Sequence, residues 1–419
     1  MGFAGGASGC RWRVQNSQTI EAVRSRSLIY TGRVSLDDDG RAELKQLEAI
    51  GRLRVPRVVD GRRGPRITLD GTEVLDLASN DYLSLAGDRR LADAAKAAVD
   101  EDGVGAGASR LIVGNHRRHV ALERSLADWL HVGAVRLFGS GYAANVGTIG
   151  ALVGVGDVVF SDELNHASLI DGCRLAKADV VVFPHRNLSV LDEKLRERSG
   201  RRRIVISESL FSMDGDLADV EGLAALAKRH GAALMLDEAH AMGARGPEGR
   251  GVAAALGVVP DLLVGTCGKA LGAYGAFVAT TPAIAQLLWN RARSLVFSTA
   301  LPPMVSAAVS AALEIVRGGE GDDRRRNLAA RATQLRSRVR DLGGHADSAI
   351  APLVVGDDRR VMELSARLFE RRVFVQGIRF PTVPEATARL RISLNAGHVD
   401  KDIEIAGIAL NDALSQEPE

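Results

Sequence analysis

The chain has 419 residues, of which 46% are hydrophobic and 25% charged, and its formal net charge is +2. This length and composition supply a large hydrophobic core and predict more than one lobe. Basic and acidic residues are mixed along the chain, so we expect no nucleic-acid partner, and no apolar run is long enough to cross a membrane. Three cysteines without metal-ligand spacing predict a cytoplasmic protein with no metal site.

The beginning of the chain differs in composition from the rest. Residues 1–36 have no apolar period and carry five arginines against one acid, Glu21. Such a start can be a transit peptide, but we expect a disordered extension. Apolar residues three apart then predict a helix over residues 37–54. Residues 66–71 and 73–77 are typical of two strands joined by an Asp-Gly turn, so residues 37–76 form an N-terminal helix and hairpin.

Short apolar runs alternate with helical stretches from residue 77 to 304. This alternation predicts an α/β domain with a large, mostly parallel sheet covered on both faces. One strand, residues 134–138, runs into a Gly-Ser-Gly-Tyr-Ala-Ala segment at 139–144 and then a helix. Free N–H groups at such a helix start bind phosphate. The segment also matches the dinucleotide-binding pattern, which leaves a nicotinamide-dependent oxidoreductase as an alternative.

Two of these strands end in polar groups that suit one cofactor. The run 232–236 closes in Asp237 and His240, and the run 262–264 leads into a glycine-rich turn that holds Lys269. Ligands of open α/β sheets bind at the carboxyl ends of the strands. A lysine amine can hold a carbonyl cofactor as a Schiff base, and a carboxylate can pair with a pyridinium nitrogen. His240 can reach a ring hydroxyl and His166 can stack on the ring, so the arrangement predicts pyridoxal 5'-phosphate (PLP).

The last part of the chain, residues 305–419, predicts a smaller C-terminal α+β domain. A long helical stretch over 305–340 is interrupted near Gly318, and strands and a helix alternate from residue 351. Arg391 lies on one of these strands, where a guanidinium suits bidentate capture of a carboxylate. A salt-bridged arginine within the sheet is the alternative.

Together these segments resemble the α-oxoamine synthases, PLP-dependent transferases with the aspartate-aminotransferase fold, from about residue 37 to 412. Within that family they are most similar to the 8-amino-7-oxononanoate synthases of biotin biosynthesis. The motifs that carry the resemblance are Ser79-Asn-Asp-Tyr-Leu83, Ser140-Gly-Tyr142, Ser161-Asp, His166-Ala-Ser-Leu169, Phe211-Ser-Met-Asp-Gly215, Asp237-Glu-Ala-His240, Gly268-Lys-Ala270, Ser298-Thr299 and Ala388-Arg-Leu-Arg391.

The resemblance implies a role for each motif residue. It makes Lys269, His166, Asp237 and His240 the catalytic residues. The implied cofactor-binding residues are Gly141, Tyr142, His166, Ser212, Asp237, His240, Thr266, Lys269, Ser298 and Thr299. The implied substrate-binding residues are Arg52, Asn80, His166, Arg379, Thr382 and Arg391. Ser298 and Thr299 would reach the phosphate in the neighbouring subunit, which implies a homodimer with shared active sites.

The reaction implied by the resemblance is the decarboxylative condensation of L-alanine with pimeloyl-CoA or a pimeloyl acyl carrier protein (pimeloyl-ACP). Glycine C-acetyltransferase and 5-aminolevulinate synthase are the near alternatives, and the segment at Thr382 favours the biotin enzyme. A non-catalytic scaffold of the same fold would be expected to lack Lys269. Departures from the family pattern at Ser84, Cys267, Tyr274 and Ala386 leave the choice of acyl chain open.

Overall fold

The computed structural model describes residues 35–415, so the extension expected over residues 1–36 lies almost wholly outside the described residues. The chain divides into two compact units, and the division falls between Val55 and Pro56. The first unit holds helix α2 (Leu36–Ala49), which begins after Ser35. The Ser35 hydroxyl accepts a hydrogen bond from the Asp38 N–H at 3.1 Å, and three aspartates in the first turn complement the helix dipole.

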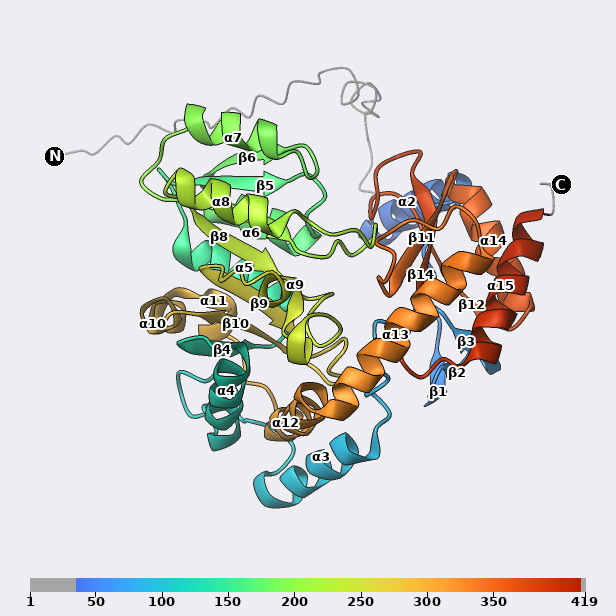
Figure 1. Ribbon diagram of the computed structural model, residues 1–419, viewed down its shortest axis with the longest axis horizontal. Coiled ribbons are helices and arrows are strands. Elements are labelled where there is room, and N and C mark those ends of the chain that lie inside the picture. Colours follow the sequence, from blue (N-terminus) through green and yellow to red (C-terminus); the bar gives the residue numbers. More distant parts are fainter. Residues whose placement is uncertain (1–34, 416–419) are drawn as a thin grey trace. The chain divides into compact units, whose positions relative to one another are not determined.

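The second unit contains a seven-stranded sheet, seen in the left half of Figure 1. In spatial order its strands are β4 (Ala134–Phe138), β10 (Ala276–Thr280), β9 (Leu262–Thr266), β8 (Ala233–Asp237), β7 (Arg203–Glu208), β5 (Val158–Asp162) and β6 (Asp179–Phe183). Strand β10 pairs antiparallel with both of its neighbours, and the other pairs are parallel. The predicted mostly parallel sheet is therefore confirmed.

Both faces of this sheet are covered because successive side chains of a strand point to opposite faces. On β7, Ile204 and Ile206 belong to one buried cluster and Val205 to another. The first cluster includes side chains of α5 (Gly141–Leu152), α6 (Ala167–Ala176), α10 (Pro282–Arg291) and α11 (Arg293–Val296). The second includes side chains of α7 (Leu188–Glu197), α8 (Val220–Arg229) and α9 (Gly251–Ala255).

The C-terminal lobe has a three-stranded antiparallel sheet of β11 (Ile350–Gly356), β14 (Ala388–Ser393) and β13 (Gln376–Ile378). Its helices are α13 (Gly319–Arg338), α14 (Asp358–Glu370) and α15 (Asp400–Ser415). The expected helical interruption is confirmed, because α12 (Pro303–Arg317) ends at Gly318 and α13 follows directly. The remaining helices of the large lobe are α3 (Arg89–Asp102), α4 (Arg117–Leu130) and the short η1 (Pro247–Gly249).

The predicted hairpin is present, with β2 (Arg66–Leu69) and β3 (Thr72–Asp76) antiparallel across Asp70 and Gly71. Both turn residues have positive φ, 50° and 74°, as a tight two-residue turn requires. Strand β1 (Val59–Arg63) extends this sheet, and β3 also pairs in parallel with β12 (Val373–Phe374). The hairpin thus shares a sheet with a strand that lies about three hundred residues later in the sequence. The four-part domain division stays a prediction.

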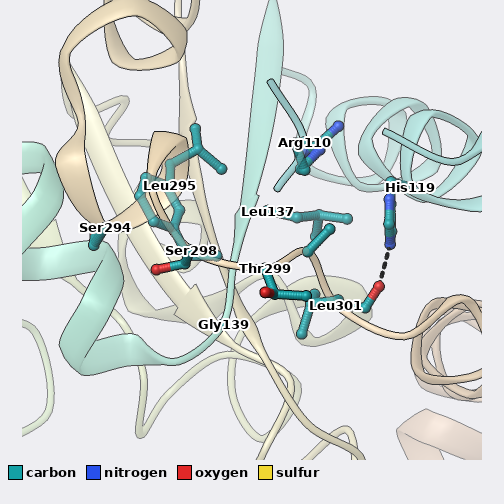
Figure 2. A pocket seen from close by; sticks show the side chains of 11 residues that line it. Arg110, His119, Leu137, Gly139, Ser294, Leu295, Ser298, Thr299 and Leu301 are labelled. Atoms are coloured by element: carbon teal, nitrogen blue, oxygen red, sulfur yellow. Dashed lines mark hydrogen bonds between the residues drawn. The ribbon is translucent and has the colours of Figure 1, made fainter. Parts of the chain in front are cut away.

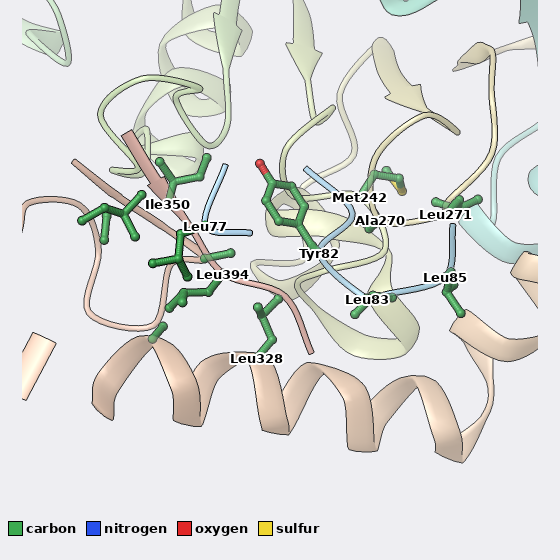
Figure 3. Close-up of a cluster of buried hydrophobic side chains, with 14 of the residues drawn as sticks. Leu77, Tyr82, Leu83, Leu85, Met242, Ala270, Leu271, Leu328, Ile350 and Leu394 are labelled. Atoms are coloured by element: carbon green, nitrogen blue, oxygen red, sulfur yellow. The ribbon is translucent and has the colours of Figure 1, made fainter. Parts of the chain in front are cut away.

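One apolar cluster links the two lobes of the second unit. Figure 3 shows Tyr82, Met242 and Leu271 of the large lobe on the same cluster as Leu328 and Leu394. Helix α13 runs along the base of the cluster, which joins the C-terminal lobe to the loops after the strand ends. Within residues 35–415, no helix is both long and apolar enough to cross a bilayer.

Candidate active site

The carboxyl ends of the central strands bring several acids and hydroxyls to one edge of the sheet. Glu208 ends β7, Asp237 ends β8, and these two residues are partners in the parallel register. Asp237 is also opposite Val264 on β9, whose last residue is Thr266. Parallel strands start and stop at the same edges, so polar residues far apart in sequence meet there.

Lys269 stands in a tight turn that follows β9. The Gly272 N–H donates to the Lys269 carbonyl at 2.8 Å, and the Cys267 N–H donates to the Gly275 carbonyl at 2.9 Å. Gly272 has a φ of +64°, and a Cβ at this position would lie 2.5 Å from the backbone nitrogen of Ala86. Only glycine permits both the left-handed conformation and the close approach of that neighbouring loop. The backbone therefore holds the lysine in one place.

The Lys269 amine begins a chain of polar contacts. Its Nζ lies 2.7 Å from His240 Nε2, and His240 Nδ1 lies 2.7 Å from the hydroxyl of the fully buried Tyr82. Tyr82 donates in turn to Asn80 Oδ1 at 3.1 Å. If Lys269 donates to Nε2, then Nδ1 carries the imidazole proton and donates to Tyr82. The imidazole proton of His240 and the hydroxyl proton of Tyr82 then each have an acceptor.

Asp237 is held by a second set of contacts. One carboxylate oxygen accepts from Asn145 Nδ2 at 2.7 Å, and the other accepts from the Ala239 N–H at 2.9 Å. Asn145 Nδ2 also donates to the Ser168 hydroxyl at 2.9 Å, and that hydroxyl lies 2.8 Å from His166 Nδ1. These contacts fix a carboxylate and an imidazole near each other on the same side of the sheet as Lys269.

Burial shifts the protonation of the whole cluster. Burial, only partly offset by Asp237 and Glu208, lowers the pKa of Lys269 to about 8. Burial and the nearby lysine lower the pKa of His240 well below its usual range. The pKa of His166 is also lowered, chiefly by burial. Burial and the adjacent Asp237 raise the pKa of Glu208 to about 8. Perturbed groups that converge in this way are typical of a catalytic site.

Arg391 reaches the cluster from the C-terminal lobe. It lies on β14, is buried, and donates through Nε to the Ser212 carbonyl at 2.6 Å. Its Nη1 donates to the Ser393 hydroxyl at 2.8 Å, and Nη2 lies 3.4 Å from the Tyr82 hydroxyl. The guanidinium has five donors, so it retains capacity for a ligand. The structure thus brings Arg391, Ser212 and Asn80 to the Lys269 cluster, as the sequence suggested.

The site fits PLP in the chemistry of its groups. The half-buried amine of Lys269, the buried carboxylate of Asp237 and the buried imidazole of His240 are together, and the exposed imidazole of His166 lies beside them. Two buried oxygens, Asn145 Oδ1 and Glu208 Oε1, have no hydrogen-bond partner. The N-terminus of α5 opens at Gly141, where a Cβ would meet nothing within 4 Å. The first N–H groups of a helix lack partners within it, so Gly141 and Tyr142 can bind phosphate. Thr266 Oγ1 accepts from the Gly268 N–H at 3.2 Å and donates to the Gly275 carbonyl at 3.2 Å.

Ser298 and Thr299 are in a different place from this cluster. Both are exposed and line a cavity of about 20 Å³ with Arg110 and His119, as Figure 2 shows. Thr299 forms a bridge with Ser109. Their predicted role in a neighbouring subunit's site remains a prediction.

The residues expected near the acyl substrate also remain predictions. Arg379 and Thr382 lie in the loop between β13 and β14, where the Thr382 N–H donates to the Arg379 carbonyl at 3.1 Å. Arg52 belongs to the first unit, which is described by itself.

Four residues of the cluster have no role predicted from the sequence: Tyr82, Asn145, Ser168 and Glu208. Three of them had a signal, because Tyr82 and Ser168 lie inside quoted motifs and Glu208 follows a predicted strand. Asn145 could have been found as a lone amide on an otherwise apolar helix, where an unpaired polar group is costly.

Comparisons with known proteins agree with this geometry. The model of the "Aminotransferase class I and II" family matches residues 72–410. An 8-amino-7-oxononanoate synthase of Geobacter sulfurreducens is 46% identical over 374 residues, which are 88% of this chain and 96% of the relative. One of Anaeromyxobacter dehalogenans is 46% identical over 362 residues, 85% and 90% of the two chains.

Solved structures give the same result. Serine palmitoyltransferase from S. paucimobilis with a bound PLP–myriocin aldimine has a TM-score of 0.85 at 30% identity, covering 90% of this chain and 96% of that chain. An 8-amino-7-oxononanoate synthase from Francisella tularensis has a TM-score of 0.70 at 28% identity, covering 81% and 98%. The chain therefore belongs to the aminotransferase class I and II family and, within it, to the 8-amino-7-oxononanoate synthases, which are PLP-dependent acyltransferases.

Proposed function

We propose that this protein condenses L-alanine with a pimeloyl thioester to give 8-amino-7-oxononanoate, CO2 and the free carrier thiol. The observation that carries the proposal is the meeting of Lys269, Asp237 and His240 at one sheet edge, in a chain 46% identical to a synthase of this name. A nicotinamide-dependent oxidoreductase is not favoured, because it would give these three residues no role. A non-catalytic scaffold is not favoured, because Lys269 is present.

The cofactor would be held by residues from five segments. Lys269 would carry it, and Asp237 would pair with its pyridine nitrogen. His240 and Ser212 would contact its ring oxygen, and His166 would stack on its ring. The backbone of Gly141 and Tyr142 would bind its phosphate together with Thr266. When bound, PLP supplies an electron sink that stabilises negative charge at the α-carbon of an amino acid.

The amino-acid substrate is held by its carboxylate. Arg391 is the donor best suited to this role, since it is buried and keeps donors beyond those used by Ser212 and Ser393. Asn80 supplies a further polar contact through its amide. Binding at these two residues orients the α-carbon of alanine toward the Lys269 amine.

Once the amino group of the substrate has replaced Lys269 on the cofactor, Lys269 Nζ would be free to move the proton. With its pKa lowered to about 8, a substantial fraction of the amine is neutral near physiological pH and can accept the α-proton. The α-carbon would form a bond to the thioester carbonyl carbon, the carbon–sulfur bond would break, and the carrier would leave as a thiolate that takes a proton from solvent. The bond to the carboxyl carbon then breaks, CO2 leaves, and Lys269 returns a proton to the α-carbon. Arg52, Arg379 and Thr382 would contact the pimeloyl chain.

We further infer a homodimer in which Ser298 and Thr299 reach the partner's phosphate site. Exposed apolar side chains support this inference, since the segments around Ile112 and Phe297 run side by side through the Ser109–Thr299 bridge. Both apolar residues are 70% exposed in the single chain. Large exposed apolar side chains that cluster mark interaction surfaces. A cytoplasmic location also remains our proposal.

A substrate comparison tests the function. The purified holoenzyme is incubated with L-alanine and pimeloyl-CoA or pimeloyl-ACP, and product, thiol and CO2 are quantified. We expect one 8-amino-7-oxononanoate per thiol released. Turnover of glycine with acetyl-CoA or succinyl-CoA in preference to this pair would assign one of the near alternatives. Lys269→Ala is expected to abolish turnover, whereas Lys228→Ala, at an exposed position of α8, is expected to retain it.

A further inference from the structure

His185 lies outside the PLP site, and each of its two ring nitrogens contacts an aspartate carboxylate. It follows β6, and its Nδ1 lies 3.0 Å from Asp162 Oδ1, the last residue of β5. Its Nε2 lies 3.0 Å from Asp216 Oδ2, in the loop that follows β7. The ring also packs edge-on against the buried Phe211, with centroids 4.3 Å apart and planes at 85°. The imidazole therefore joins the sheet edge to the loop 211–216.

The geometry requires a doubly protonated ring. A carboxylate oxygen only accepts hydrogen bonds, and a neutral imidazole has one N–H, so two such bonds need the imidazolium. Burial opposes this charge, but hydrogen bonds to Asp162 and Asp216 outweigh burial and raise the pKa of His185 to about 9. The other charged neighbours are Arg186, which donates to Asp216 Oδ2 at 3.1 Å, and Glu163, which accepts the His185 N–H at 2.8 Å.

The loop held by His185 also touches the substrate-binding arginine. Inside the loop, the Phe211 N–H donates to the Asp216 carbonyl at 3.0 Å, so the two ends of the loop move together. Between them, the Ser212 carbonyl accepts from Arg391 Nε at 2.6 Å. Asp214 forms an ion pair with Arg389, the neighbour of Arg391 on β14. The position of Arg391 thus depends on where this loop lies.

We propose that His185 is a positioning residue that, as an imidazolium, holds the loop 211–216 against β14 and so aims Arg391 at the carboxylate of the amino-acid substrate. The proposal rests on the proposed function through the role of Arg391. Without the imidazolium the loop keeps its internal bonds and the contact between Arg186 and Asp216, but it loses the direct link through His185 to Asp162. Arg391 then samples other positions, and the amino acid binds less tightly.

Steady-state kinetics test the positioning role. In His185→Gln one donor remains and the charge is lost, and we expect the KM for the amino acid to rise about tenfold or more while kcat stays within about twofold. The matched control is His230→Gln, since His230 Nε2 also contacts an aspartate, Asp192 Oδ1, at 2.7 Å. His230 precedes the start of β8 and therefore lies at the opposite edge of the sheet. The control should leave both constants unchanged. An unchanged KM in a folded His185→Gln enzyme, or an equal fall in kcat, would overturn the proposal.

Two further measurements test the protonation of His185 and the role of its partner Asp216. Nitrogen-15 NMR of histidine-labelled holoenzyme at pH 8 should find both ring nitrogens of His185 protonated, assigned by loss of the signal in His185→Gln. A neutral ring at pH 8 would contradict the proposal that a His185 imidazolium bonds both Asp162 and Asp216. Asp216→Asn should raise the KM as His185→Gln does and serves if the histidine variant does not fold. The kinetics use whichever amino acid the wild type turns over, so an error in the proposed substrate appears in the wild-type profile and not in these comparisons.

Discussion

The hydroxyl of Tyr82 offers a sharp test of how the site is assembled. Tyr82→Phe removes one oxygen that lies 2.7 Å from His240 Nδ1, 3.1 Å from Asn80 Oδ1 and 3.4 Å from Arg391 Nη2. The ring can keep its place in the core, because phenylalanine has the same shape without the hydroxyl. What changes is that a fully buried imidazole N–H loses its acceptor. Leaving such a group unsatisfied costs about 1–3 kcal/mol.

We therefore expect the free energy of unfolding of Tyr82→Phe to fall by about 1–3 kcal/mol, measured by urea denaturation with circular dichroism. The control Tyr274→Phe alters a tyrosine that is 57% exposed, and it should change the free energy of unfolding by less than about 0.5 kcal/mol. Because Asn80 and Arg391 also lose their contact with the hydroxyl, the KM for the amino acid should rise with the loss of stability. A variant as stable as the wild type would refute the hydrogen-bond chain from Lys269 to Asn80.

Four other outcomes follow from the same geometry. Gly272→Ala should destabilise the chain by about 2–4 kcal/mol, from positive φ and backbone overlap, while Gly87→Ala, which meets nothing within 4 Å, stays near the wild type in thermal melts. Burial raises the pKa of Glu208 to about 8, so the wild type should lose stability as pH rises from 4.5 to 8, and Glu208→Gln should flatten that slope. Because the pKa of His185 is raised to about 9, its imidazolium stabilises the fold fully below pH 6.5, and this stabilisation is lost as pH rises through 9. The stability of His185→Gln should not show this fall between pH 6.5 and 9. Finally, uptake of PLP by the apoprotein should accelerate with a midpoint near pH 8, since the pKa of Lys269 is about 8, and a midpoint near 10.5 would contradict its burial.

The sequence alone determined the elements and the edge of the sheet where the chemistry lies. Alternating apolar runs and helical stretches predict a mostly parallel sheet, and in such a sheet the carboxyl ends of the parallel strands lie at the same edge. This is why Asp237, Lys269 and His166 could be assigned to one site before any coordinates. Gly318 marked the break between two helices for a similarly local reason, because glycine without a side chain to pack weakens a helix interior.

Only the tertiary structure decided which groups touch. The contacts between Tyr82 and His240 and between Arg391 and Ser212 join residues 158 and 179 positions apart, and no local period encodes such pairs. The antiparallel direction of β10 and the pairing of β3 with β12 likewise depend on how the chain returns through space. The protonation of Lys269 is set in the same way, because desolvation by many distant neighbours, and not its own sequence context, moves its pKa.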